Sequence, residues 1–458
     1  MMPVRPALLW LVLLWPGAGL AQAPVLDPAF DRALSQAYLY NPQLTAERQR
    51  LRETDEGVPQ ALSGWRPSVV LQGTAGGSAV FDSIDRARVP ELRRPQQFDL
   101  RLTQPLYTGG RVGAQVLQAE ALVVAERATL RASEAGVLLA AGTAYMDVAR
   151  DARIVLLNRN QAVVLERTLR ASQQQFAAGA VTQTDVEQAR ARLADQRGTL
   201  AQSEGDLAAS RARFEQQVGT LPGELDLPRL ALPLPASREA ALASVLSDNF
   251  DVAQARAALE ASRQGIDIAR AGLLPRLSIE IRGSRDRETD VQLYRQRDNI
   301  AEGTLSFAVP LYQGGGPAAQ TRQAKEAAQR TLLQIEVVAR AARQQTQSAW
   351  DMLEAGRERM RQASVSIEAN TVAVRGVARQ QGVGARTLLD VLNAQQELVA
   401  AQVNLARATR DARVAELELL AVGGRLTAER LGLHAPVYDP ARHYDATRER
   451  WQGLGPAP

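Results

Sequence analysis

One sequence pattern occurs twice in this chain and limits what the chain can fold into. It reads LRLTQPLYTGGR at Leu100–Arg111 and returns as LSFAVPLYQGGG at Leu305–Gly316, 205 residues later. Each copy alternates apolar with polar or small residues, as a strand does, and ends at a glycine pair. About one hundred residues follow each copy with hardly a proline and with abundant Ala, Arg, Gln and Glu, a composition typical of long helix. Two junctions of one design predict an internally duplicated chain.

The two helical stretches keep the same register. Each is interrupted once, at Gly179 in the first and at Gly382 and Gly384 in the second, which predicts helical hairpins with glycine at their tips. Beyond the interruption, apolar residues recur every seven positions, and each one in the second stretch lies 205 residues after its counterpart. These residues are Val186, Leu193, Leu200, Leu207 and Phe214, and then Val391, Leu398, Leu405, Ala412 and Leu419. A seven-residue period predicts coiled-coil packing of antiparallel helices.

The chain is expected to divide into a secretory signal, a first repeat, a linker, a second repeat and a polar tail. The corresponding residues are 1–23, 24–218, 219–236, 237–422 and 423–458. The signal is indicated by Arg5, the short apolar run Ala7–Trp15 and the small residues Ala21 and Ala23 at a cleavage position. The tail is expected either to wrap the middle of the molecule or to be disordered.

Composition excludes several classes of function. The 54 basic and 50 acidic residues are interspersed, so we expect solvated helix faces and no nucleic-acid partner. The chain has no cysteine, which excludes disulfides, thiolate metal sites and cysteine nucleophiles. Its two histidines, His434 and His443, lie in the polar tail, where we expect surface loops and no metal site. No acidic pair stands apart as a general acid and base, so we expect no enzyme and no cofactor.

Four strands are expected, two in each repeat around a polar loop. The strands are Ser68–Thr74, Phe98–Tyr107, Leu277–Arg282 and Gly303–Leu311, and the loops are Phe81–Gln97 and Ser284–Asp298. Strands that are apolar on one face and polar or small on the other fit either an outer-membrane barrel or a hairpin on a soluble sheet. The export signal and the shortage of other strands favour the barrel.

Four strands cannot close a membrane barrel, which needs about eight or more, and lipid does not tolerate open strand edges. Several copies must therefore share one barrel: two copies would supply eight strands and three would supply twelve. The helices would project from its rim, and residues 113–176 alone would reach roughly 95 Å at 1.5 Å per residue. The expected fold class is a mixed α/β membrane protein, with four transmembrane β-strands per subunit and long antiparallel coiled-coil helices.

In this order and spacing, the motifs resemble the TolC-like outer membrane factors of Gram-negative efflux and type I secretion systems. The resemblance covers Ala29–Leu420 and rests on the doubled Pro-Leu-Tyr-x-Gly-Gly junction, on FAAG at Phe176–Gly179 with the TDV that follows it, and on GVGARTLLDVL at Gly382–Leu392. It implies a homotrimer with a twelve-stranded β-barrel in outer-membrane lipid and a periplasmic α-barrel. It also implies a periplasmic adaptor protein and an inner-membrane transporter of the RND, ABC or MFS type as partners.

The resemblance further implies which residues close the periplasmic end of the tunnel. Arg386, opposite Thr184 and Asp185, would latch two helical hairpins by charge-assisted hydrogen bonds. Asp390 would form an acidic ring on the axis that favours cations. The alternative is that Arg386 and Asp390, four residues apart, simply pair along one helix.

Two positions depart from the family pattern at this end. Asn393 stands where some relatives carry a second ring carboxylate, so the ring would carry one charge per subunit. Gln381 stands where some relatives carry a latching tyrosine, so that link would be weaker or absent.

The strand-to-helix junctions carry another set of candidate residues, in which proline and tyrosine precede the glycine pair. They are Pro105, Tyr107, Gly109 and Gly110 in the first copy and Pro310, Tyr312, Gly314 and Gly315 in the second. Glycine here predicts backbone turns with positive φ at the rim of the barrel. The run Gly109–Gly113 also matches a phosphate loop weakly, but the second copy does not keep that pattern.

The leading hypothesis is a passive export duct. As a channel-tunnel subunit it would carry substrates from an inner-membrane transporter and adaptor across the periplasm and outer membrane, in drug efflux or in type I protein secretion. The alternative is a non-conducting coiled-coil envelope scaffold or surface structural protein, which would have no use for lipid-facing strands. A secreted enzyme would need a convergent polar site that the sequence does not show.

Overall fold

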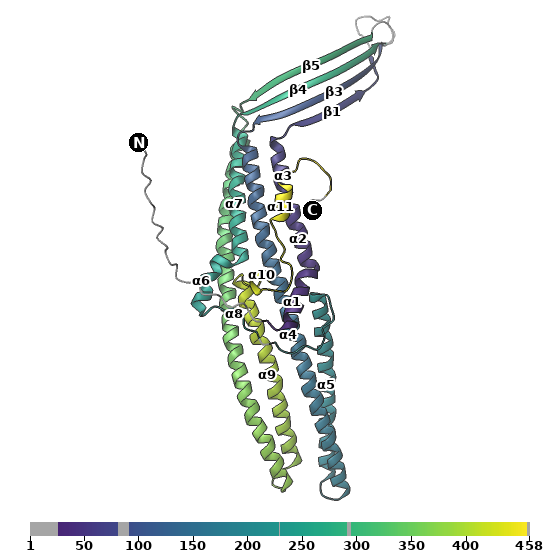
Figure 1. Cartoon of the computed structure of the whole chain (residues 1–458), viewed down its shortest axis with the longest axis vertical. Helices are drawn as coiled ribbons and strands as arrows, with labels where there is room; N and C mark the ends of the chain where they lie inside the picture. Colours follow the sequence, from purple (N-terminus) through teal and green to yellow (C-terminus); the bar gives the residue numbers. More distant parts are fainter. Residues whose placement is uncertain (1–25, 81–90, 229, 291–294, 456–458) are drawn as a thin grey trace, which may run out of the picture.

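The computed structural model describes residues 26–80, 91–228, 230–290 and 295–455, so the expected signal segment lies outside the described residues. The molecule is long and narrow (Figure 1). A β-sheet lies at one end, helices run away from it, and two helical hairpins form the other end. No helix in the described ranges is both long enough and apolar enough to cross a membrane.

Each half of the chain contributes short helices, then long strands, then a long helical hairpin, which confirms the internal duplication. The first half contains α1 (Pro28–Tyr40), α2 (Pro42–Asp55), α3 (Gly57–Leu62), β1 (Ser68–Ala75), β2 (Ser78–Val80), β3 (Glu91–Tyr107), α4 (Arg111–Ala177) and α5 (Gln183–Val218). The second contains α6 (Arg238–Asp248), α7 (Phe250–Arg270), β4 (Arg276–Asp290), β5 (Arg295–Ala308), α8 (Gly316–Gly382) and α9 (Leu388–Val422). The tail adds α10 (Ala428–Leu431) and α11 (Arg442–Thr447).

An asparagine at the same place in each repeat ties a short helix to a long one. Asn41 caps α2 with its Oδ1, and its Nδ2 donates to the carbonyl of Gln217 at the end of α5, at 3.1 Å. Asn249 caps α7 in the same way and donates to the carbonyl of Val422 at the end of α9, at 2.9 Å. Because both asparagines are buried, each satisfies backbone groups that have no access to water.

Glycine pairs make the turn from strand to helix in both repeats. Gly109 and Gly110 have φ angles of 66° and 81°, and Gly314 and Gly315 have φ angles of 59° and 80°. This is the left-handed region, which glycine enters without strain. A Cβ placed on Gly109 would lie 2.8 Å from Leu274 of the second repeat, whereas one on Gly314 would meet no described atom within 4 Å. The first junction is therefore packed against the other repeat, and the second junction is open.

The strands form one antiparallel sheet in the order β1-β3-β4-β5, with β2 also beside β3. Directly paired residues share a face, and apolar residues gather on one of the two faces. They are Val69, Leu71, Leu100, Leu102, Ile279, Ile281, Leu305 and Phe307. On the other face Arg282 donates to Asp99 at 2.6 Å, and Arg101 lies 3.2 Å from Glu280. The expected alternation is confirmed, with one face suited to lipid and the other to a watery lumen.

The strands extend further than the sequence pattern predicted. Parts of the two expected polar loops, Phe81–Gln97 and Ser284–Asp298, are strand, and the rest of both loops lies outside the described residues. The parts that are strand are residues 91–97, 284–290 and 295–298. The loop prediction was wrong because nearly all residues there are charged or polar, so no apolar period marks the strands, although their backbones still form the ladder. At its other end β5 stops at Ala308, short of the expected Leu311.

The long helices pair as two antiparallel hairpins, α4 with α5 and α8 with α9, as expected. Helix α4 lies inside the molecule, because α1, α2, α7 and α9 also pack against it. Helix α8 packs mainly against α7 and α9, and on its other side it exposes a row of apolar side chains. We call this row the α8 stripe; its residues are Leu333, Val337, Met352, Val365 and Val372. An uncovered apolar row of this length marks α8 as an edge of the subunit.

The tail is ordered over its described residues, which corrects one of the two expectations for it. Helix α10 packs in the apolar core at the middle of the molecule. The chain then runs along α2 and α4 toward the sheet (Figure 1). His443, expected on a surface loop, is buried with its Nδ1 3.0 Å from the carboxylate of Asp55. The sequence could not show this pairing because the two residues are 388 positions apart. His434 is exposed, as expected, and lies 2.8 Å from Asp31.

Candidate functional site: the hairpin tips and the groove between the hairpins

Both hairpins end in the same kind of turn. Gly179 and Gly384 have φ angles of 74° and 76°. The residue after each glycine donates its N–H to a carbonyl five residues earlier, at 2.8 and 2.9 Å. This bond and the left-handed glycine satisfy the last carbonyls of the helix, as in a Schellman motif. Gly382 is the last helical residue of α8 and has no positive φ.

A threonine caps the helix that follows each turn, and an aspartate three residues later completes a capping box. Asp185 accepts bonds from the N–H and hydroxyl of Thr182 at 3.0 and 2.7 Å, and Asp390 accepts the same two bonds from Thr387 at 3.0 and 2.9 Å. The Thr182 hydroxyl, followed by its N–H, lowers the pKa of Asp185. The Thr387 N–H, followed by its hydroxyl and the charge of Arg386, lowers the pKa of Asp390. Each tip therefore carries one fixed negative charge at neutral pH.

Within one subunit, Arg386 pairs along its own helix. Its Nη1 lies 4.0 Å from Oδ1 of Asp390, the geometry of the alternative that the sequence left open. Among the described residues Arg386 makes no ion pair or hydrogen bond with Thr184 or Asp185, and Thr184 is exposed. Gln381 supplies a backbone carbonyl to the tip turn, at 3.0 Å. A latch between hairpins through Arg386 stays a prediction.

A link between the two hairpins is made by Arg192, which belongs to none of the sequence motifs. Arg192 of α5 donates to Oδ1 of Asn393 at 2.8 Å and to Oε1 of Gln396 at 2.7 Å, and both acceptors lie on α9. Asn393 and Gln396 are exposed and Arg192 is partly exposed, so each bond contributes only about 0.5–1.5 kcal/mol. No pattern in the sequence marks this link, because polar residues that flank an apolar heptad all look alike until the facing helix is placed.

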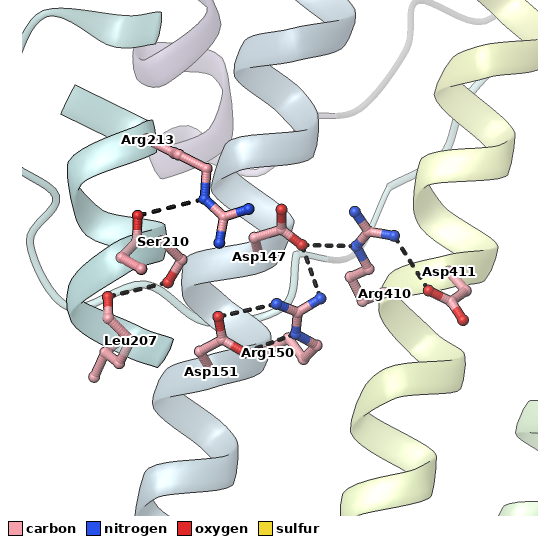
Figure 2. Close-up of polar contacts among 9 residues, drawn as sticks. Asp147, Arg150, Asp151, Leu207, Ser210, Arg213, Arg410 and Asp411 are labelled. Carbon is pink, nitrogen blue, oxygen red and sulfur yellow. Dashed lines mark hydrogen bonds and ion pairs between the residues drawn. The ribbon is translucent and has the colours of Figure 1, made fainter. Parts of the chain in front are cut away.

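Nearer the middle of the molecule, ion pairs join α4 to α9 of the other hairpin (Figure 2), and a further pair continues from α9 to α8. Asp147 of α4 accepts from Arg150 of the same helix at 2.9 Å and from Arg410 of α9 at 2.8 Å. Arg410 also binds Asp411 at 3.2 Å, and the second oxygen of Asp411 lies 3.3 Å from Arg359 of α8. This network fixes the position of one hairpin against the other, and no sequence pattern marks it.

The charges of this network are held by mutual contacts. Two hydrogen bonds from Arg150 to Asp151, at 2.7 and 2.9 Å, raise the pKa of Arg150, and the charges of Asp151 and Asp147 act in the same direction. Both aspartates are largely buried. Removing one member would leave a partly buried charge without its partner, which is costly in a dry environment.

A polar groove of about 620 Å³ runs between the α4–α5 hairpin and α9. The ion-pair network borders one end, and the Arg192 link lies toward the other. Side-chain amides and charges line its length, among them Asn158, Gln196, Asn404 and Arg407. No group of three His, Asp or Glu side chains suited to a metal ion is found in the part of the chain that the structure describes. The groove is suited to hydrogen-bonding a polar surface laid along it.

The remaining candidate residues lie at the strand-to-helix junctions. Pro105 sits at a shift of register between β3 and β4, where a strand tolerates the missing N–H. Tyr107 is the last residue of β3 and is half exposed. Pro310 and Tyr312 follow β5, and Tyr312 is 88% exposed at the open second junction.

A sheet with two open edges and one apolar face, joined to helical hairpins that extend far beyond it, defines a subunit of an outer-membrane channel. This chain belongs to the outer membrane efflux protein family, whose model matches residues 33–220 and 241–425. The resemblance to TolC-like factors is thereby confirmed. So is the expected fold class, a duplicated mixed α/β subunit with outer-membrane barrel strands and long antiparallel helices. The protein is a channel-tunnel subunit for export, placed in the outer membrane of a Gram-negative bacterium and extending into the periplasm.

Individual relatives agree with this assignment. The outer membrane efflux protein BepC of Brucella suis is 33% identical over 440 residues, which are 96% of this chain and 94% of BepC. The alkaline protease secretion protein AprF of Pseudomonas aeruginosa is 28% identical over 60% of this chain and 59% of AprF. A crystal structure of CusC shares the fold, with a TM-score of 0.77 at 18% identity over 90% of this chain and 95% of CusC. These relatives are channel and export proteins.

Proposed function

We propose that this chain is the exit duct of an efflux assembly and moves small toxic compounds, with no catalysis or cofactor of its own. The observation that carries this proposal is the likeness to an efflux protein along 96% of the chain. A passive duct needs only a continuous passage, and the energy for transport comes from an inner-membrane transporter of the RND, ABC or MFS type.

Three copies of the chain form the duct as a homotrimer. In the single subunit the outer edges of β1 and β5 are unpaired in the described residues, and open edges do not persist in lipid. The turn at Gly109, which packs against Leu274 within the chain, supplies the template: the matching turn at Gly314 of one copy would pack in the same way against the first repeat of the next. The α8 stripe would be covered by the same neighbour.

The repeats then alternate around the axis. Residues 24–218 and 237–422 are the two structural repeats, a division supported by the two stretches that the family model matches. The linker 219–236 and the tail 423–458 join the repeats at the middle of the subunit, and residues 1–23 are removed on export.

A periplasmic adaptor protein reaches the duct through the groove between the hairpins. The groove runs along the helix axes, is open to solvent and is lined by amide and charged side chains. A helical hairpin with polar residues on one face would fit it by hydrogen bonds rather than by apolar burial. The adaptor therefore holds the duct loosely enough to release it.

The gate is formed where the tips of the three subunits meet. Asp390 supplies one charge per subunit to an acidic ring, which is supported by its ionised, partly exposed carboxylate. When the gate is closed, Arg386 leaves its weak contact with Asp390 and binds Thr184 and Asp185 of a facing hairpin instead. Asn393 and Gln381 leave the ring and the second link weaker than in relatives that carry a carboxylate or a tyrosine there.

A second candidate function, secretion of a protein, is favoured by the likeness to AprF. Deletion of the gene separates the two, and purified protein in planar bilayers tests the duct itself. We expect discrete conductance steps, and a deletion strain with greater sensitivity to dyes and detergents but an unchanged set of secreted proteins. Loss of a secreted protein at unchanged sensitivity would favour the second function. An SDS-resistant oligomer that conducts no current would contradict both and support a scaffold.

A further inference from the structure

The C-terminal tail is attached to the first repeat at regular intervals along its described length. The contacts, from the middle of the molecule toward the sheet, are His434 with Asp31, Tyr438 with Tyr38, His443 with Asp55, and Arg448 with Glu120, at 2.8, 2.9, 3.0 and 3.0 Å. The tail therefore follows one fixed course up the outside of α1, α2 and α4 (Figure 1).

This course ends at the base of the sheet. Arg66 donates to the carbonyl of Arg450 at 3.1 Å, and its guanidinium lies 4.7 Å from the centre of the Trp451 ring. Arg66 precedes the first residue of β1, Ser68, by only two positions. Trp451 is thus held at the level of the molecule where the strands end and the helices begin. Because the sheet is the membrane-embedded part, this level is the periplasmic surface of the outer membrane.

The side chains at this end have the chemistry of a membrane interface. Trp451 is 67% exposed although one face of its ring lies against Arg66, and Leu454 is fully exposed. Indole rings favour the headgroup region of a bilayer, where the apolar ring and the polar N–H are both accommodated. Among the described residues Arg66 and Arg450 form no ion pair; Arg66 donates to the carbonyl of Arg450 and Arg450 to the carbonyl of Gln452, and their other N–H groups can donate to phosphate oxygens.

We propose that the segment Trp451–Leu454 is an interfacial anchor that places Trp451 and Leu454 among the headgroups of the periplasmic leaflet, with Arg66 and Arg450 on phospholipid phosphates. The anchor gives each subunit an attachment to lipid that is separate from its strands. Lipid is favoured over a neighbouring subunit because the segment turns away from α3 instead of following the helices (Figure 1).

Tryptophan fluorescence tests the anchor. Trp65 and Trp350 are the other tryptophans outside the expected signal segment, so the variant Trp65→Phe/Trp350→Phe leaves Trp451 as the reporter. The full-length oligomer is placed in phosphatidylcholine vesicles with or without bromine on the acyl chains near the headgroups. We expect Trp451 emission to be shifted to the blue relative to unfolded protein and to lose intensity in the brominated vesicles.

A matched variant reports on a position remote from lipid. Trp65→Phe/Trp451→Phe leaves Trp350, which packs in a small apolar cluster on α8 and should show no loss of intensity in brominated lipid. Two results would overturn the anchor. Unquenched, red-shifted Trp451 emission would place the residue in water, and unquenched, blue-shifted emission would place it against a neighbouring subunit.

Discussion

Asp185 and Asp390 occupy the same place in two equivalent capping boxes. Comparing them therefore separates the effect of the Asp390 charge on the channel from the effect of losing a capping-box carboxylate. Both accept an N–H and a hydroxyl bond from a threonine three residues earlier, and both have a lowered pKa. Asp390→Asn should lower the cation preference of the channel, because it removes one charge per subunit from the proposed ring. The reversal potential under a salt gradient measures this preference.

Asp185→Asn is the matched control for charge, since it removes the same charge from the same kind of capping box. Because Asp185 is also the proposed partner of Arg386 in the closed gate, only the reversal potential is compared between the two variants. The reversal potential of this variant should stay that of the parent protein. Equal shifts in both variants would show that the caps, and not a ring of Asp390, set the selectivity.

Arg192 provides a second test among single residues. Arg192→Ala removes both of its bonds to α9, each worth about 0.5–1.5 kcal/mol, and should let the two hairpins separate more readily. We expect a higher single-channel conductance or a longer open time in planar bilayers. Arg190→Ala is its control, because Arg190 binds Glu187 on its own helix at 3.0 Å and joins no hairpins. A current that changes equally in both variants would show that the link through Arg192 does not control opening.

Among the elements, the attachment of α10 to α4 depends on pH. Burial raises the pKa of Glu134, although the N–H of Ala428, bonded at 2.6 Å, and the charges of Arg48 and Arg131 oppose this effect. The folded protein therefore holds this proton to higher pH than the unfolded chain does. Ionisation of Glu134 then lowers stability progressively as pH rises from about 4.5, the unfolded value, through the folded pKa.

Glu134→Gln keeps an acceptor for Ala428 and removes the buried charge. We expect this variant to unfold at a higher temperature than the parent protein at pH 7.5, by a few degrees at most, and at nearly the same temperature below pH 4.5. Thermal unfolding followed by circular dichroism at the two pH values measures the difference. A lower unfolding temperature at pH 7.5 would mean that the charge of Glu134 stabilises the attachment.

The elements differ in how far sequence could foresee them. The long helices, their glycine tips and the junctions were predictable because proline, glycine and apolar period act through local backbone geometry. The outer parts of β3, β4 and β5 could not be predicted, because the residues paired there include charged ones such as Arg94 and Arg285 and show no apolar periodicity. The links through Arg192, Asp147 and His443 were not predictable either, since each joins residues from helices whose relative placement only the fold supplies.

For the whole molecule, the α8 stripe and the open sheet edges make a single prediction about assembly. Val337 is 58% exposed and lies on the side of α8 away from its own subunit. Val337→Glu should prevent the SDS-resistant oligomer from forming, because the charge would be buried without a partner between copies.

Gln334→Glu adds the same charge to an exposed position nearby and should have a much smaller effect. Gel mobility of unheated samples and the molar mass in detergent measure both. A Val337→Glu protein that still runs as the heat-sensitive oligomer would show that the stripe faces something other than a neighbouring copy.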